Sequence, residues 1–271
     1  MAGLLLHSAR MSCFARLFLA ALAAAFLSAC SLTAPAPPAD PTPPPRSVMR
    51  QAAARLTAVI ISSKNELDPW VESRFADGRG PEDADGGSGI PISPDGYFLT
   101  ADHVLARSAG KNVFILHGQQ GGRLRATKAR IVWRSPSTDL ALLHIPIATP
   151  RHYDWTPVDR WLPVGTPVVH SGIATGFRSE PGKLVTPIEP GKGARFKHDI
   201  PLEPGDSGGA LIDARGLLVG VNSAVEFLVP MDTAFFIESE ANRPNVRSLQ
   251  RLIDGDRRRN KQPLPAVSSV P

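Results

Sequence analysis

The segment of residues 204–211, PGDSGGAL, contains the residue types that a nucleophilic serine requires. Such a serine needs a tight backbone turn that exposes its hydroxyl and directs nearby N–H groups toward a developing oxyanion. Gly205, Gly208 and Gly209 permit a turn of this kind. A glycine-rich hairpin turn is the alternative, but with glycine usage of about 7% the sequence GDSGG is rarely met by chance. We therefore predict Ser207 as a nucleophile and the backbone N–H groups of Gly205 and Ser207 as its oxyanion hole.

A general base for this nucleophile is offered by His103, near the end of residues 87–104, GSGIPISPDGYFLTADHV. Alternating apolar residues, a turn with Pro and Gly, and a second apolar run from Tyr97 predict a β-hairpin that ends just before His103. An imidazole held at the end of a strand can be partly exposed and can accept a proton near neutral pH. A structural histidine is the alternative, so this assignment depends on partners.

Asp139 lies between these two motifs, in residues 135–145, SPSTDLALLHI. It opens an apolar strand from Leu140 to Leu143, where a carboxylate can stay ionised and orient an imidazole. An aspartate that caps a strand entrance is the alternative. Because His103, Asp139 and Ser207 occur in the chain order of the chymotrypsin triad, each next to a strand and a turn, we predict that they form a catalytic triad.

The composition favours short strands as the elements that position these residues. The chain has 271 residues, 42% of them hydrophobic, with 23 Gly and 27 Pro that separate many short apolar runs. This pattern predicts an all-β protein. The formal charge is +5, and two of the positive charges, Arg10 and Arg16, lie in a segment that we expect to be removed. The remaining charge is too small to indicate a nucleic-acid partner.

The first thirty residues have the features of a secretory signal. Residues 17–27 are almost wholly apolar and follow Arg10 and Arg16, and they are too few to span a bilayer comfortably. The sequence Leu-Ser-Ala-Cys at residues 27–30 resembles the bacterial lipobox, in which the cysteine sulfur is diacylated. The prediction is a signal peptide over 1–29 and a lipid-modified Cys30. An ordinary secretory signal is the alternative, and translation can start at Met1 or Met11.

Several consequences follow from a lipid on Cys30. The other cysteine, Cys13, lies inside the signal, so the folded part is expected to have no disulfide. Residues 30–46 are rich in Pro, Ala and Thr and are expected to form an extended tether. With Ser31 in place of an aspartate retention signal, we expect the protein to be lipid-anchored in the outer membrane and to face the periplasm.

The chain resembles the trypsin-like serine peptidases, and among them the bacterial Deg-type (high-temperature-requirement) catalytic domain. The matching stretches contain the three predicted catalytic residues and a following strand: residues 87–104, 137–145, 199–213 and 216–225. The resemblance implies two antiparallel six-stranded β-barrels, a peptidase domain over 47–256, and a site in the cleft between the barrels. It also implies a serine endopeptidase that hydrolyses peptide bonds of cell-envelope proteins through an acyl-enzyme. Asp206 departs from the Asn usual in Deg-type enzymes. In digestive trypsins this Asp pairs with a new amino terminus, a mechanism that a lipid-modified terminus makes doubtful.

Short helices are expected at both ends of this domain. Apolar residues at helical spacing, among them Val48, Ala52, Leu56 and Ile60, predict a helix over 47–60. A second helix is expected over residues 245–253. A disordered, solvated basic tail is expected over 257–271.

The family resemblance also predicts a substrate pocket. The base of the pocket in trypsin-like enzymes lies six positions before the nucleophile, which is Pro201 here, next to Leu202. Asn222 and Val225 are expected to form the opposite wall. Since none of these carries a charge, we predict cleavage after small or aliphatic residues, unless Glu203 turns inward.

Two other functions remain as alternatives. The first is a catalytically silent binding or scaffold protein on a peptidase fold, although such proteins normally lose a triad residue or a turn glycine. The second is an esterase, which would need GxSxG between a strand and a helix, whereas Ser207 precedes another strand. We expect no cofactor and no metal, and the sequence does not indicate an oligomeric state.

Overall fold

A computed structural model describes residues 45–72, 85–120, 123–175, 181–228 and 235–260. These residues belong to one compact unit, Asp40–Pro271. The predicted signal peptide, Cys30 and nearly all of the predicted tether lie outside the described residues. No helix among the described residues is both long enough and apolar enough to cross a membrane.

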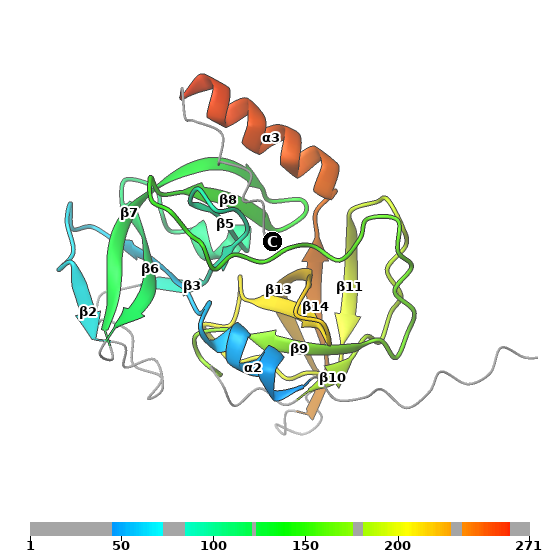
Figure 1. Cartoon of the computed structure of the whole chain (residues 1–271). Helices are drawn as coiled ribbons and strands as arrows, with labels where there is room; N and C mark the ends of the chain where they lie inside the picture. Colours follow the sequence, from blue (N-terminus) through cyan, green and yellow to red (C-terminus); the bar gives the residue numbers. More distant parts are fainter. Residues whose placement is uncertain (1–44, 73–84, 121–122, 176–180, 229–234, 261–271) are drawn as a thin grey trace, which may run out of the picture. The chain divides into compact units, whose positions relative to one another are not determined.

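Two curled antiparallel β-sheets make up most of the described chain (Figure 1). The first sheet has eight strands in the order β3 (Asp85–Ser88), β1 (Ala58–Ser62), β6 (Asn112–Gln120), β7 (Arg123–Ser135), β8 (Leu140–His144), β5 (Tyr97–Thr100) and β4 (Ile90–Pro91), with β2 (Trp70–Glu72) paired to β7. The second has six: β10 (Gly182–Lys183), β9 (Pro167–Ser171), β12 (Ala210–Asp213), β13 (Leu218–Leu228), β14 (Phe235–Arg243) and β11 (Ala194–His198).

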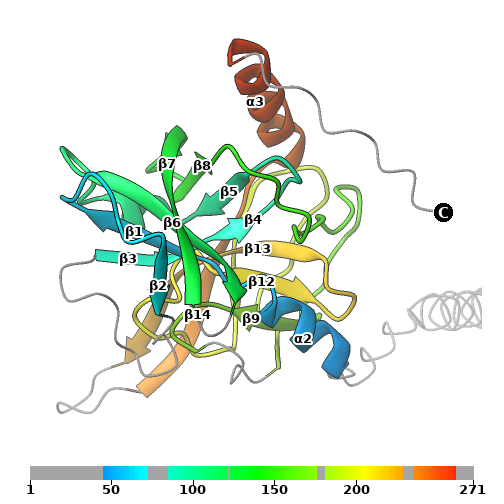
Figure 2. The same ribbon diagram turned by 60° about the vertical axis from the view of Figure 1, so that its left-hand side comes forward.

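The predicted chymotrypsin-like fold is confirmed, with the first sheet nearly closed into a barrel and the second a half-barrel (Figure 2). The first sheet has eight described strands where six were predicted. One reason is that β2 adds to the edge of β7. The other is that the chain passes from β3, which pairs with β1, to β4, which pairs with β5.

The core explains why the apolar runs form strands. Every residue of β8 is buried, and successive side chains point to opposite faces of the strand. Leu140 and Leu142 pack in a cluster that also contains Val169 and Val221 of the second sheet, whereas Ala141 and Leu143 pack inside the first barrel. Each fully buried leucine contributes about 1.5–3 kcal/mol. The strand that follows Asp139 is therefore fixed on both sides.

The N-terminal helix is shorter than predicted. Helix α2 spans Arg46–Ala53 and buries Val48 and Ala52. The prediction was wrong for Leu56, which follows the helix, and for Ile60, which lies in β1. The run AVIIS of β1 is rich in β-branched residues and pairs with β3 on one side and β6 on the other.

The C-terminal helix is longer than predicted. Helix α3 spans Val246–Arg259, and the Asn245 side chain caps it by accepting from the N–H of Ser248 at 3.0 Å. The predicted disordered tail therefore does not begin at residue 257, because Arg257 is buried and its guanidinium donates to Asp95 at 2.7 and 2.8 Å. Residues 261–271 of that tail lie outside the described residues.

Helix α3 is also joined to the first sheet by Asp256, which is buried next to Arg257. Its carboxylate accepts a hydrogen bond of 2.9 Å from the hydroxyl of Tyr97, and two more from Arg130. Figure 1 shows α3 beside β8 and β5, consistent with these contacts. The helix that ends the described chain is thus bound to the strand that leads to His103.

Candidate active site

His103 is positioned by a hairpin and a short 3-10 helix. Strands β4 and β5 form the predicted hairpin, with Ile90 opposite Leu99, and the 3-10 helix Asp102–Leu105 follows β5. Asp102 is buried and accepts two hydrogen bonds, at 2.7 and 2.9 Å, from the Arg134 guanidinium of β7. The His103 side chain is 49% exposed. The segment that carries His103 is thus fixed by the pair of Asp102 with Arg134, while about half of the imidazole side chain stays exposed.

The Asp139 carboxylate contacts both the backbone N–H and the imidazole ring of His103. The Nδ1 atom of His103 lies 2.9 Å from Oδ2 of Asp139, and the backbone N–H of His103 donates to Oδ1 at 2.9 Å. Asp139 has a φ of +48°, a left-handed conformation that aspartate tolerates better than most residues. The conformation occurs at the residue that enters β8. The structure therefore brings these two predicted residues together.

Ser223 joins this pair to Ser207, a connection that sequence reasoning missed. The Ser223 hydroxyl donates to Oδ2 of Asp139, and the Ser223 carbonyl accepts a hydrogen bond of 3.1 Å from the hydroxyl of Ser207. Among the described residues, no hydrogen bond joins Ser207 to His103. The one feature of the sequence that could have indicated a role for Ser223 is its position in residues 216–225, the last stretch that resembles the Deg-type domain.

These contacts set the charge state of the pair. The hydrogen bond to Asp139 raises the pKa of His103 above its ordinary value, although partial burial acts in the opposite direction. For Asp139, burial acts to raise the pKa, but hydrogen bonds from His103 and Ser223 outweigh it, so the pKa of this carboxyl is lowered. Asp139 therefore stays ionised at neutral pH, and His103 is well suited to accept a proton.

The turn that carries Ser207 is pressed against the first barrel. The backbone N–H of Ser88 donates to the carbonyl of Ser207 at 2.8 Å, and the Ser88 hydroxyl donates to the carbonyl of Gly205 at 2.7 Å. Gly208 has a φ of +84°, and a Cβ there would lie 2.3 Å from the Ser88 carbonyl and from the Thr100 hydroxyl. Only glycine therefore fits at this position.

The two N–H groups predicted as an oxyanion hole are available to a ligand. In the described part of the chain, neither the N–H of Gly205 nor that of Ser207 donates to a protein acceptor. The neighbouring N–H groups of Asp206, Gly208 and Gly209 are all used, by the carbonyls of Glu203, Asn222 and Asp206. Among the described residues, these two N–H groups of the nucleophile turn therefore remain without a protein acceptor.

The predicted substrate pocket is corrected at one position. The side chain of Asn222 is 0% exposed and is hydrogen-bonded to His198 and His170 inside the second barrel, so it cannot form a pocket wall. Pro201 is exposed and Leu202 is buried. The side chain of Val225 lies outside the described residues.

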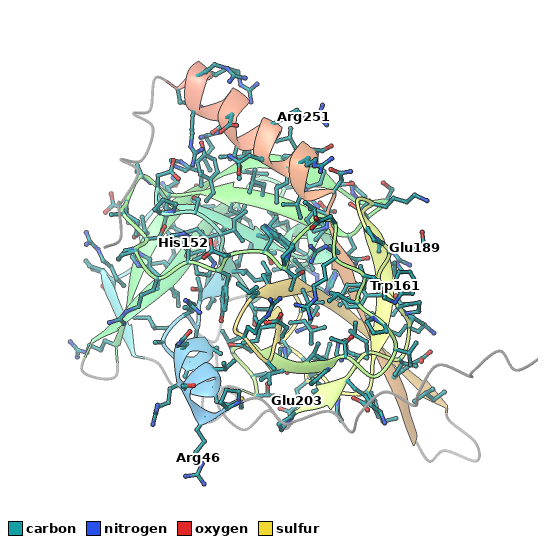
Figure 3. The ribbon with its side chains drawn as sticks, turned by 45° about the vertical axis from the view of Figure 1, so that its right-hand side comes forward. Arg46, His152, Trp161, Glu189, Glu203 and Arg251 are labelled. Atoms are coloured by element: carbon teal, nitrogen blue, oxygen red, sulfur yellow. The ribbon has the colours of Figure 1, made fainter. Side chains whose placement is uncertain are left out.

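Two carboxylates near the nucleophile are also placed. Glu203 is exposed and has not turned inward (Figure 3). Asp206 is fully buried and its Oδ1 lies 3.2 Å from Nε2 of His170, a contact that sequence reasoning did not foresee. No cluster of three or more His, Cys, Asp or Glu among the residues described has the arrangement of a metal site.

Known proteins share both the sequence motifs and the fold. Residues 87–221 match the family model of the trypsin-like peptidase domain. A probable periplasmic serine endoprotease DegP-like from Marinomonas sp. (strain MWYL1) is 36% identical over 152 residues, which are 51% of this chain and 29% of the relative. The corresponding protein of Pseudomonas fluorescens is 29% identical over 176 residues, 57% of this chain and 34% of that protein. The chain spans about a third of the length of these curated relatives.

Solved structures agree on the fold. The HtrA-type protease AlgW with decapeptide has a TM-score of 0.53 and 22% identity, covering 77% of this chain and 67% of its own. The serine endoprotease from Yersinia pestis has a TM-score of 0.52 and 22% identity, covering 77% and 66%. These likenesses and the two barrels define a protein of the chymotrypsin-like fold. The matched domain and the curated relatives together support a trypsin-like serine peptidase domain of the Deg type.

Proposed function

We propose that this protein is a serine endopeptidase in which Ser207 is the nucleophile, His103 the general base and Asp139 the residue that orients the base. The observation that carries the proposal is the hydrogen-bonded cluster in which Asp139 contacts both His103 and Ser223, while Ser223 accepts from Ser207. Each of these residues comes from a different strand or turn, and a purely structural role does not require their convergence at an exposed imidazole.

The proposed reaction begins when the Ser207 hydroxyl rotates from the Ser223 carbonyl toward Nε2 of His103. The hydroxyl oxygen then attacks a peptide carbonyl carbon as its proton passes to His103. The N–H groups of Gly205 and Ser207 stabilise the oxyanion, an interaction that in serine peptidases is worth about 3 kcal/mol per donor. His103 then gives the proton to the leaving amine, and water hydrolyses the acyl-enzyme by the reverse route.

We infer that the substrates are proteins or peptides of the cell envelope. The structural neighbour AlgW was solved with a decapeptide, which supports a protein or peptide as the substrate. The curated relatives are named as periplasmic, which supports a cell-envelope location. We further propose that the peptidase domain predicted over 47–256 extends to the end of α3 at Arg259, and that a tether over 30–46 links it to a lipid on Cys30.

The anchor is tested separately from the activity. Cys30→Ser removes the only predicted lipid site, so the variant is expected in the soluble periplasmic fraction, while the parent chain pellets with outer membranes. Pelleting of the Cys30→Ser variant after a salt wash would show that the lipid is not the anchor.

Hydrolysis of an unfolded protein such as casein tests the enzymatic proposal. The parent chain is expected to cleave it, and Ser207→Ala is expected to reduce turnover by about a millionfold while the thermal unfolding curve is unchanged. Ser223→Ala is a useful companion, because it should lower turnover only about tenfold by removing one hydrogen bond to Asp139.

A silent scaffold is the second candidate function. It is favoured by one observation, the hydrogen bond of the Ser207 hydroxyl to Ser223 instead of to His103. A folded parent chain that does not cleave casein, and that behaves like Ser207→Ala, would support the scaffold and contradict the peptidase.

A further inference from the structure

Three polar side chains lie in the core of the second sheet, on three different strands. His170 of β9, Asn222 of β13 and His198 of β11 are each no more than 1% exposed. Burying groups of this kind is costly unless every donor and acceptor is matched. Their arrangement therefore needs a reason beyond packing.

The three side chains form a continuous series of contacts that ends at the nucleophile turn. Nε2 of His198 lies 3.1 Å from Oδ1 of Asn222, and Nδ2 of Asn222 is hydrogen-bonded to Nδ1 of His170. Nε2 of His170 then lies 3.2 Å from Oδ1 of Asp206, within ion-pair distance although outside hydrogen-bond angles. The series links β11 to the residue before Ser207.

The hydrogen bonds in this series all donate in the same direction, from His198 through Asn222 to His170. The N–H of Ile200 donates to Nδ1 of His198 at 3.3 Å, and burial lowers the pKa of His198 to about 3, so this ring is neutral. Its single proton is therefore on Nε2 and is donated to the Asn222 carbonyl oxygen. The Asn222 amide in turn donates to Nδ1 of His170. The proton of His170 is thus placed on Nε2, facing Asp206.

Asp206 is in turn hydrogen-bonded to backbone N–H groups around it. Its Oδ2 accepts from the backbone N–H of Glu203 at 3.0 Å, and its Oδ1 accepts from the N–H groups of Ala174 and Thr175 at 3.1 Å. Burial acts to raise the pKa of Asp206, but the contact with His170 and these N–H donors outweigh it and lower the pKa. A buried carboxylate thus ties the nucleophile turn to the segment that follows β9.

Two glycines leave room for the contact between His170 and Asp206. A Cβ on Gly172 would lie 2.4 Å from Oδ1 of Asp206 and 2.7 Å from Nε2 of His170. A Cβ on Gly209 would lie 3.1 Å from Cε1 of His170. Gly172 has no positive φ, so the space itself is what this position provides.

We propose that His170 is a positioning residue for catalysis: held by Asn222, it directs an N–H at Asp206 and thereby fixes the turn that presents Ser207 and the oxyanion-hole N–H groups. The effect on turnover rests on the peptidase function proposed above. The effect on the turn itself does not, because it follows from the buried contacts alone.

The experiment compares His170→Leu with His170→Gln in the full-length chain. Leucine fills similar space but donates nothing, so kcat is expected to fall about tenfold to a hundredfold with KM changed less than about threefold. Glutamine can donate an N–H to Asp206 and is expected to recover most of kcat. Amide hydrogen exchange over residues 203–209 is expected to be about tenfold faster in His170→Leu than in the parent chain. His144→Gln is the matched control, a buried histidine of the first barrel that contacts the Asp95 carbonyl.

The outcomes separate the two proposals. Unchanged exchange over 203–209 in His170→Leu, or a fall in kcat no larger than in His144→Gln, would overturn the role of His170. The parent chain could also fail to hydrolyse any peptide while His170→Leu still shows faster amide exchange over 203–209. That result would support the contact of His170 with Asp206 and reject the peptidase function. If His170→Leu does not fold, Asn222→Ala decides, since it keeps His170 but removes its partner: faster exchange confined to 203–209 supports the proposal, and unchanged exchange there overturns it.

Discussion

The Ser88 hydroxyl donates to the carbonyl oxygen of Gly205 at 2.7 Å, joining the first barrel to the nucleophile turn of the second. Because this bond holds the carbonyl of Gly205, it restricts the rotation of the adjoining peptide groups. The same hydroxyl accepts from the N–H of Ile173 at 2.9 Å. One serine side chain of β3 therefore fixes two segments around the proposed oxyanion hole.

Replacement of this serine tests whether the first barrel orients the turn. We expect Ser88→Ala to lower kcat about tenfold, the effect of losing one or two neutral hydrogen bonds, with little change in KM. Thr166→Ala is the control, since it removes a comparable hydroxyl bond to the Pro163 carbonyl on the surface. Steady-state kinetics on a peptide substrate provides the comparison, and equal kcat for the two variants would contradict the positioning role.

The pH dependence of kcat/KM tests the pairing of His103 with Asp139. A general base must be neutral, and Asp139 raises the pKa of His103, so activity should rise with pH through a midpoint above the ordinary value of 6.5. Asp139→Asn removes the charge that stabilises the imidazolium, so the midpoint should move down and kcat should fall about ten-thousandfold. If the rise of kcat/KM with pH has the same midpoint in Asp139→Asn as in the parent chain, His103 is not the titrating base.

Cleavage specificity follows from the carboxylates near the nucleophile. Pro201 and Leu202 carry no charge, Asp206 is held by His170, and Glu203 is exposed. We therefore expect cleavage after small or aliphatic residues such as Ala, Val or Leu. Profiling on a peptide library tests this, with Glu203→Gln expected to give the same profile. A dominant preference for Arg or Lys that disappears in Glu203→Gln would show that Glu203 enters the pocket.

The stability of the domain is expected to depend on the end of α3. Arg257→Ala leaves the Asp95 carboxylate without its guanidinium partner, and breaking a mostly buried pair costs about 3 kcal/mol. Arg258→Ala is the matched control, because it removes the same charge from an exposed position of the same helix. Urea unfolding compares them, and a difference below about 0.5 kcal/mol would show that α3 is not held by this pair.

Local patterns were sufficient to predict an all-β protein and the partners His103 and Asp139, whereas the two-barrel fold was inferred from the family resemblance. Glycine spacing and short apolar runs encode turns and strands directly, so the hairpin before His103 and the strand after Asp139 could be predicted. Ser223 could not be assigned, because its contact with Asp139 depends on how the two barrels pack. Arg257 was misassigned for a related reason, since its partner Asp95 is 162 residues away.

The sequence also could not predict the inner side of the second barrel. Asn222 was expected at a pocket wall because its strand matches the wall of trypsin-like enzymes. Which face of that strand meets the pocket depends on register, and a shift of one residue exchanges the faces. His170 and His198 lie on other strands, at sequence distances of 52 and 24 residues from Asn222.

The central claim, that Ser207 is an activated nucleophile, is tested most directly by a fluorophosphonate probe. The purified domain is treated with the probe, digested, and the modified residue is located by mass spectrometry. One adduct is expected, on Ser207, and it should be absent from Ser207→Ala and strongly reduced in a folded His103→Ala variant. A folded parent chain that remains unlabelled, or an adduct on another serine that persists in Ser207→Ala, would contradict the central claim.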